Sequence, residues 1–248
     1  MTILSYTAVG VWCFLTALAG GIAGLVLGNI RLPALLLVAS SPAAGAGANI
    51  GVSAIAALTA GTTHIRAGRI DWRLAAWMTP PSVGGAVLGG LAAGALPGNV
   101  LLVVIGFVLL VFGIDLLRRT HRPSGVRPKG VDVRAAVIAG GLIGLLGGLV
   151  GLILGSLRMP ALLRLGEPPA KAVGTNLAVG VSVGVAGVAG HLPGGIDWGL
   201  LALGAAASIP GALLGARLTG RLDERRLLRV VGAILLVAGA AAIIEGMA

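Results

Sequence analysis

Residues 20–49 read GGIAGLVLGNIRLPALLLVASSPAAGAGAN, and residues 147–176 repeat this pattern as GGLVGLILGSLRMPALLRLGEPPAKAVGTN. The two stretches align without a gap, so that Arg31 falls on Arg158. Further matched pairs are Gly28 with Gly155, Pro33 with Pro160, and Asn49 with Asn176. The match continues on both sides and covers nearly the whole chain. An internal duplication of this extent predicts two structurally related halves.

The composition is typical of a membrane protein. The chain of 248 residues is 57% hydrophobic and 10% charged, with 43 glycines and a mean hydropathy of +1.03. Runs of about 20 apolar residues recur along it, which is the length of a helix that crosses a bilayer. Gly and Ala allow helices to approach closely in lipid. We therefore expect an all-α polytopic membrane protein.

Six apolar runs predict full spans, near residues 43–62, 74–95, 99–117, 171–190, 198–218 and 227–244. The segments 3–39 and 133–166 are each too long for one span and carry the Gly–Arg–Pro motif, which breaks a helix. Two interpretations compete for them. Either each segment crosses once, giving eight spans, or each enters and returns as a re-entrant helix pair, giving about eight hydrophobic segments in all.

The 18 Lys and Arg residues favour the re-entrant interpretation. Single crossings would divide them evenly between the two sides, whereas basic residues normally gather in the cytoplasmic loops. Re-entrant pairs place all of them except Arg31 on one side, or opening towards it. We therefore predict inverted-topology repeats at 1–117 and 133–248, a cytoplasmic basic linker at 118–132, and both termini outside. This is a common plan for transporters.

The two matched arginines are the principal site candidates. Each lies in an apolar run beside a predicted helix break, with Pro33 or Pro160 as the first residue of a new helix. Such a helix start directs free N–H groups at an anion. Alternatively, Arg31 and Arg158 extend to the membrane interface. A charge at a helix centre costs about 2.5–3.5 kcal/mol on insertion scales, and this cost favours a substrate or gating role.

Small and polar residues near the breaks complete the predicted substrate site. They are Gly28, Asn29, Asn49, Gly155, Ser156, Thr175 and Asn176, with Ser82 and Ser208 as secondary candidates. The asparagines could instead cross-link helices, and the serines could simply allow close packing.

The motifs of several other protein classes are missing from the sequence. It contains no catalytic motif, no cluster of metal ligands and no cofactor motif, so we expect neither an enzyme nor a cofactor or metal. No carboxylate lies at the centre of a predicted span, where a coupled transporter commonly carries one. Nucleic acid is not expected as a partner, because topology explains the net charge of +10 and stacking aromatics are scarce.

The duplicated motif resembles the TauE/SafE sulfite-exporter family, also called the toluene-sulfonate uptake permease group. The likeness is carried by Gly24…Gly28…Pro33-Ala34-Leu35, by its second copy from Gly151 to Leu162, by Gly47-Ala48-Asn49 with its copy Gly174-Thr175-Asn176, and by the Gly68–Trp72 segment. The resemblance implies transport of sulfite, sulfonates and related anions across the cytoplasmic membrane of a prokaryote. This chain departs from the family pattern in its thinned glycine run and in the Arg two residues before each Pro.

Together these observations predict an inner-membrane transporter of small anions, most specifically sulfite or sulfonates, that works by alternating access between the two repeats. A passive anion channel and a non-transporting scaffold subunit are the alternatives. The bilayer and a small anionic substrate are the expected partners. The direction of transport, a coupling ion and a homo-oligomeric assembly stay open at this stage.

Overall fold

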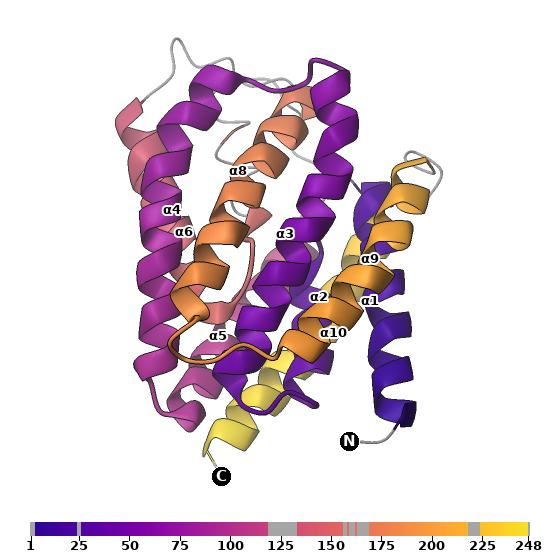
Figure 1. Cartoon of the computed structure of the whole chain (residues 1–248), viewed down its shortest axis with the longest axis vertical. Coiled ribbons are helices and arrows are strands. Elements are labelled where there is room, and N and C mark those ends of the chain that lie inside the picture. The colour runs from indigo at the N-terminus through magenta and orange to yellow at the C-terminus, as the bar shows by residue number, and fades with distance from the viewer. Residues whose placement is uncertain are drawn as a thin grey trace.

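The computed structural model describes residues 3–23, 26–118, 133–155, 158, 162, 169–217 and 224–247, which form a bundle of helices (Figure 1). The helices are α1 (Ile3–Ala23), α2 (Gly28–Leu36), α3 (Pro42–Arg66), α4 (Trp72–Ala95), α5 (Gly98–Arg118), α6 (Val133–Val150), α8 (Pro169–His191), α9 (Trp198–Arg217) and α10 (Glu224–Met247). The regular secondary structure of the described residues is helical throughout, so the predicted all-α class is confirmed for them.

The described residues of each of the six predicted apolar runs lie in one helix, in the order α3, α4, α5, α8, α9 and α10. Among the described residues, four stretches are long and apolar enough to cross a membrane: Pro42–Arg66, Gly98–Asp115, Lys171–His191 and Trp198–Gly215. Shorter apolar helical stretches cover Ser5–Gly21 and Ala136–Val150. By the length and composition of its helices the chain is a multi-pass membrane protein, while six full spans stay a prediction.

The first predicted helix break is present, but it lies earlier than Pro33. Helix α1 ends at Ala23 and α2 begins at Gly28, with Pro33 inside α2. The N–H of Ile30 donates to the carbonyl of Leu27 at 3.2 Å and to Oδ1 of Asn29 at 3.1 Å. The prediction that Pro33 starts the new helix is therefore wrong. The fixed φ of proline suits a helix, and in so short a helix only one backbone hydrogen bond is lost.

The second break follows from the conformation of Gly151. Helix α6 ends at Val150, and Gly151 has a φ of +73°, which favours glycine. Its N–H donates to the carbonyl of Gly148 at 3.3 Å, and the N–H of Leu152 donates to Gly147 at 2.7 Å. These two bonds form a Schellman motif, which ends a helix. Ser156 and Pro160 lie outside the described residues, so their predicted roles stay predictions.

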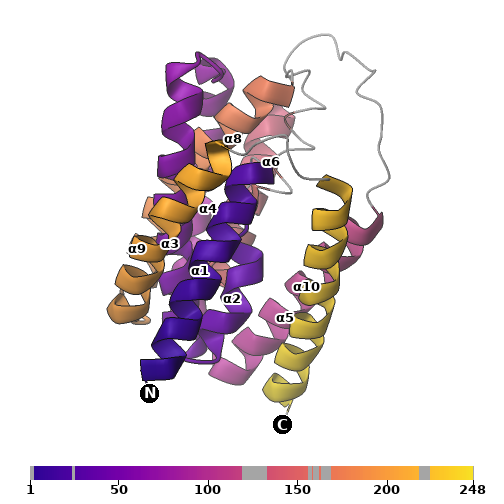
Figure 2. The ribbon, with the colours of Figure 1, turned by 90° about the vertical axis from the view of Figure 1, so that its right-hand side faces the viewer.

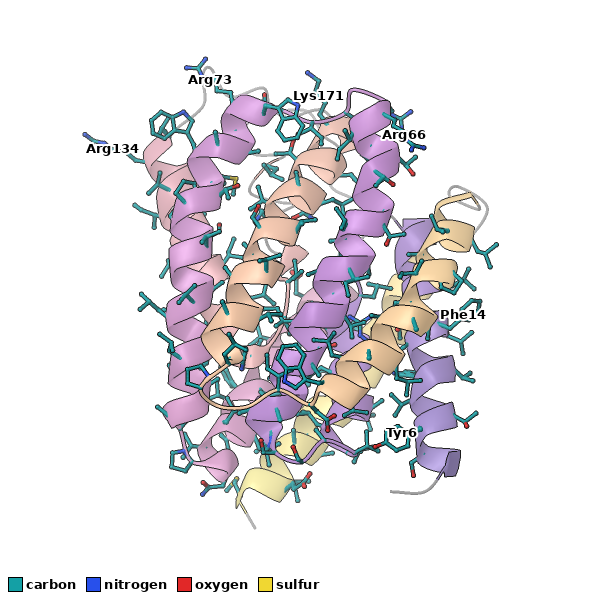
Figure 3. The ribbon with its side chains drawn as sticks, in the orientation of Figure 1. Tyr6, Phe14, Arg66, Arg73, Arg134 and Lys171 are labelled. Carbon is teal, nitrogen blue, oxygen red and sulfur yellow. The ribbon has the colours of Figure 1, made fainter. Side chains whose placement is uncertain are left out.

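The directions of the helices show where the chain doubles back. Helices α1 and α3 both begin at the end of the molecule where the N-terminus lies, so α2 returns towards that end (Figures 1 and 2). Helices α6 and α8 both begin at the opposite end, near the labelled Arg134 and Lys171 (Figure 3). Arg66 and Arg73 lie at this same end, whereas both termini lie at the other (Figures 1 and 3).

The packing of the helices follows the sequence duplication. Helix α4 packs along α6 and α8, and its counterpart α9 packs along α1 and α3. The counterparts α3 and α8 pack against each other, as do α5 and α10. All of these contacts join the two halves, and each either has an equivalent contact or joins two equivalent helices.

Glycines allow α4 and α6 to touch backbone to backbone. A Cβ added to Gly85 would collide with the carbonyl oxygen of Gly141 and would lie 2.7 Å from the backbone nitrogen of Leu145. Gly144 on α6 has the same relation to the backbone of Ser82. Close approach of this kind, made possible by small residues, is the usual way in which helices associate in lipid.

The neighbouring residues Gly84 and Gly85 give a matched test of this interface. Gly84 is exposed and a Cβ there would meet nothing within 4 Å. We expect Gly85→Ala to lower stability by about 1–3 kcal/mol, because the helices must move apart. Gly84→Ala should keep or raise it, since alanine is the better helix former. Thermal unfolding of both variants in one detergent measures the difference, and equal melting temperatures would contradict the described interface.

Candidate functional site

The side chain of Arg31 is buried inside the bundle and fully engaged by neutral partners. Its Nε donates to Oδ1 of Asn49 at 3.0 Å, and its Nη2 donates to Oγ of Ser53 at 2.6 Å. A longer contact of 3.5 Å joins Nη1 to Oγ of Ser208. Arg31 is 1% exposed, and Asn49, Ser53 and Ser208 are completely buried. The guanidinium on α2 is thus bonded to α3 and α9.

Asn49 extends this network into the second half of the chain. Its Nδ2 donates to the carbonyl oxygen of Gly151 at 2.8 Å, while its Oδ1 accepts from Arg31. The backbone of Gly151 lies directly against Ala46, so close that a Cβ on Gly151 would collide with it. One amide group therefore joins the arginine of the first half to the helix break of the second.

Arg158 is also completely buried, but its hydrogen bonds differ. Its Nη1 donates to Oδ1 of Asn176 at 3.3 Å. Its Nε and Nη2 have no hydrogen-bond partner among the described residues. A charged donor buried without an acceptor is costly, so this half of the predicted site is incomplete as it stands.

The other predicted site residues divide into two groups. Gly28 packs against Ser53 and Asn49, and Gly155 packs against Asn176, so both lie beside the arginine networks. Asn29 and Thr175 instead have structural partners: Asn29 accepts from Ile30 N–H in its own helix, and Thr175 Oγ1 accepts from the N–H of Asp71 at 2.9 Å.

The secondary candidates Ser82 and Ser208 differ from each other. Ser208 contacts Arg31 and donates to the carbonyl of Cys13 at 3.4 Å. Ser82 is equally buried, but its hydroxyl has no hydrogen-bond partner among the described residues. The structure therefore brings Ser208 to an arginine, whereas no described bond joins Ser82 to one.

Two residues that hold Arg31 and its helix in place were not predicted from the sequence. Ser53 lies one turn after Asn49 on the same helix face, and that spacing was the available signal. Trp12 donates its indole N–H to the carbonyl of Ile30 at 3.1 Å and so ties α1 to α2. Neither residue has an identical counterpart in the second copy, where Gly180 and Ala139 occupy the matching positions.

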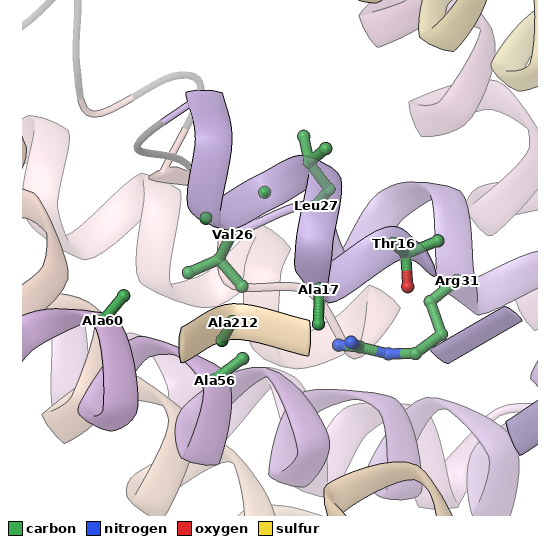
Figure 4. Close-up of a pocket in the computed structure, with 10 residues that line it drawn as sticks. Thr16, Ala17, Val26, Leu27, Arg31, Ala56, Ala60 and Ala212 are labelled. Carbon is green, nitrogen blue, oxygen red and sulfur yellow. The ribbon is translucent and has the colours of Figure 1, made fainter. Parts of the chain in front are cut away.

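A small cavity lies beside Arg31. It is lined by this arginine, by Thr16 and by small or apolar residues that include Ala17, Leu27 and Ala212. Figure 4 shows the Arg31 side chain extending towards Ala17. The space open to the centre of a water molecule is about 10 Å³, which is room for a single water. The cavity as described is too small for a polyatomic anion.

The charges of the two arginines are not neutralised by buried carboxylates. Arg31, Arg158, His191 and Cys13 are the titratable side chains buried among the described residues, and no Asp or Glu belongs to this group. Both guanidinium groups therefore lie in a low-dielectric interior with uncharged hydrogen-bond partners. Their positive charge thus has no buried counter-charge among the described residues.

Ser53 and Ser82 form a matched pair for testing how the arginines are held. Ser53→Ala should lower stability by about 1.5–3 kcal/mol, because it removes a hydrogen bond to a charged group. Ser82→Ala removes a hydroxyl that has no described partner and should cost much less. The melting temperatures of both variants, purified in one detergent without added anion, measure this. An equal loss for both would contradict the described difference.

Comparison with known proteins relates the chain to membrane transporters. The family described as Sulfite exporter TauE/SafE matches residues 9–242. The probable membrane transporter protein YjnA of Bacillus subtilis (strain 168) is 27% identical over 246 residues, covering 91% of this chain and 94% of its own. The probable membrane transporter protein YunE of the same organism is 22% identical over 275 residues, covering 98% and 99%. No solved structure gives a significant match. The chain belongs to the TauE/SafE sulfite exporter family of membrane transporters.

Proposed function

We propose that this transporter carries small oxyanions, sulfite or sulfonates, across the cytoplasmic membrane of a prokaryote by alternating access around a site between its two halves. The observation that carries the proposal is the pair of buried arginines at matched positions, without a buried carboxylate among the described residues. The description of the TauE/SafE family names sulfite export, which supports an oxyanion as the substrate.

The electrostatics of the site favour an anion. An isolated charge in a membrane-spanning bundle is costly, and polar or ionisable residues at that depth usually mark a substrate pathway. Arg31 and Arg158 are the two largest completely or almost completely buried side chains. Their protein partners are amides and hydroxyls, which leave the positive charge in place. A bound oxyanion would supply the missing negative charge.

Alternating access is supported by the arrangement of the helices. The two halves start at opposite ends of the bundle and pack through equivalent contacts, as expected for inverted repeats. The cavity at Arg31 has room for one water only, so an oxyanion enters this site after the halves rearrange. Backbone contact through glycines such as Gly85 and Gly144 leaves few side chains to obstruct a sliding movement.

The basic residues support one orientation in the membrane. Arg66, Arg73, Arg134 and Lys171 lie at the end of the bundle opposite both termini (Figure 3). Basic residues gather on the cytoplasmic side, so we place this end and the linker 118–132 in the cytoplasm and both termini outside.

A passive anion channel is the second candidate. It is favoured by the lack of a buried carboxylate among the described residues, since a proton- or sodium-coupled carrier commonly uses one. The rate of sulfite movement as a function of concentration separates the two mechanisms. A carrier saturates at modest turnover, whereas a channel supports currents that do not.

Flux through purified protein tests the proposed function. Proteoliposomes that contain the wild type should move labelled sulfite, and sulfate and methanesulfonate can be compared with it. Arg31→Ala and Arg158→Ala should each slow sulfite movement by at least about tenfold, the effect of losing one charge-assisted hydrogen bond. The exposed Arg66 provides the matched control, because Arg66→Ala removes an arginine without touching the site.

The outcomes separate the alternatives. Equal rates in the wild type and both buried-arginine variants would refute a site at the arginines. If the wild type moves none of the three anions, the chain is not an oxyanion transporter, and a scaffold role becomes the better account. The gradient imposed across the vesicles shows the direction of transport.

A further inference from the structure

The two buried arginines differ in which edge of the guanidinium is free. We infer that the Nε–Nη2 edge of Arg158, together with the hydroxyl of Ser82, is the group that binds the oxyanion directly. The same edge of Arg31 is filled by the protein, so Arg31 acts mainly as a structural residue. This inference rests on the proposed function and identifies the contact within it.

The planar geometry of a guanidinium makes the Nε–Nη2 edge suitable for binding two oxygens at once. The N–H of Nε and one N–H of Nη2 point to the same side of the planar group. Two parallel donors of this kind match two oxygens bonded to one atom, which is how arginine binds carboxylate or phosphate bidentately. Sulfite, sulfate and sulfonate groups offer the same pair of oxygens, whereas a single water offers only one.

In the first half, two protein oxygens occupy the equivalent edge. Oδ1 of Asn49 accepts from Nε of Arg31 at 3.0 Å, and Oγ of Ser53 accepts from Nη2 at 2.6 Å. Both partners are completely buried. An oxyanion could use this edge only by displacing both bonds, so the first half is closed to bidentate binding at this position.

In the second half, the matching Asn176 contacts a different nitrogen of its arginine than Asn49 does in the first half. Asn176 accepts from Nη1 of Arg158 at 3.3 Å, which leaves Nε and Nη2 without a partner among the described residues. Arg158 is completely buried, so these donors are not compensated by bulk water. Two adjacent unsatisfied donors on a buried charge are expensive, and a two-oxygen anion satisfies both together.

One sequence difference between the two copies accompanies this change in contacts. Gly180 occupies the repeat position of Ser53, so the second half lacks the hydroxyl that closes the edge in the first. Apart from its own helix, only Ile153 and Ala57 lie within 4 Å of where a Cβ of Gly180 would be, counting the described residues. Both are apolar and can accept no hydrogen bond.

The repeat correspondence assigns Ser82 as an additional donor to the same ligand. It is the repeat counterpart of Ser208, which contacts Arg31 directly. The Ser82 hydroxyl is completely buried and has no hydrogen-bond partner among the described residues, like the open edge of Arg158. Arg31 thus contacts the serine of the opposite half, whereas Arg158 and the matching serine Ser82 are both left with unsatisfied groups, which an oxyanion would bridge.

Lysine substitutions test the inference, because lysine keeps the charge but lacks the bidentate fork. The readout is the rise in melting temperature of the purified protein with increasing sulfite, which gives the sulfite affinity. We expect Arg158→Lys to weaken sulfite binding by about tenfold to a hundredfold, with no fall in the melting temperature measured without sulfite. Arg31→Lys should lower that melting temperature and weaken sulfite binding at least about tenfold less than Arg158→Lys does.

Ser82→Ala is the second variant, chosen because a buried hydroxyl without a partner can be removed without harming the fold. We expect it to weaken sulfite binding by about two- to tenfold, and Ser208→Ala, whose hydroxyl is already engaged, to weaken it less. If Arg158→Lys cannot be purified in a folded state, Ser82→Ala decides alone, and an unchanged sulfite affinity overturns the inference.

The outcomes distinguish this inference from the proposed function. Equal loss of affinity in the two lysine variants, or a greater loss in Arg31→Lys, overturns the inference while the transport proposal stands. An affinity that does not depend on Arg158 also overturns it, because water alone then satisfies the open edge. A wild type that neither binds nor moves sulfite, sulfate or methanesulfonate refutes both.

Discussion

A guanidinium group buried in an apolar bundle needs acceptors for its N–H groups, and this need organises the centre of the molecule. Arg31 is served by Asn49 and Ser53 on α3 and by Ser208 on α9. These bonds fix the short helix α2 against two long helices. The charge itself is left without a carboxylate among the described residues, and the proposed preference for anions rests on this.

The duplication supplies two copies of this arrangement, and the differences between them are as informative as the matches. The arginine, the asparagine one helix further on, and the serine of α4 or α9 are common to both halves. Ser53 is not, because its counterpart is Gly180. A network that is closed in one half is therefore open in the other. Two halves that share a fold can in this way divide structural and ligand-binding roles between them.

Much of the helical framework could be predicted from the sequence. Apolar runs of spanning length, Gly-rich breaks and the repeat register all depend on local composition, and the helices follow them closely. The place of Pro33 within its helix could not be predicted in this way, since proline is compatible with both the start and the interior of a short helix. In the structure the helix begins at Gly28, five residues before Pro33.

The partners of side chains were harder to predict, because they depend on how distant segments meet. Thr175 belongs to the same Gly174-Thr175-Asn176 motif as Asn176, yet its hydroxyl accepts a hydrogen bond from the backbone N–H of Asp71, just before α4. Ser53 was not predicted, because a comparison of the two copies draws attention to the residues that they share, and Ser53 is not one of them. Which nitrogen of Arg158 meets Asn176 is a matter of side-chain rotamers, which a sequence does not specify.

Both polar atoms of the Asn49 amide are hydrogen-bonded: Oδ1 accepts from Arg31 of its own half, and Nδ2 donates to the carbonyl of Gly151 in the other half. A displacement of α3 relative to the second break must therefore rupture the bond to Gly151 or drag the Arg31 network with it. The hydrogen bond from Asn49 to Gly151 therefore stabilises the described conformation relative to any state in which the halves have moved apart. A change in the strength of that one bond would alter the relative lifetimes of the two states while leaving the open edge of Arg158 unchanged.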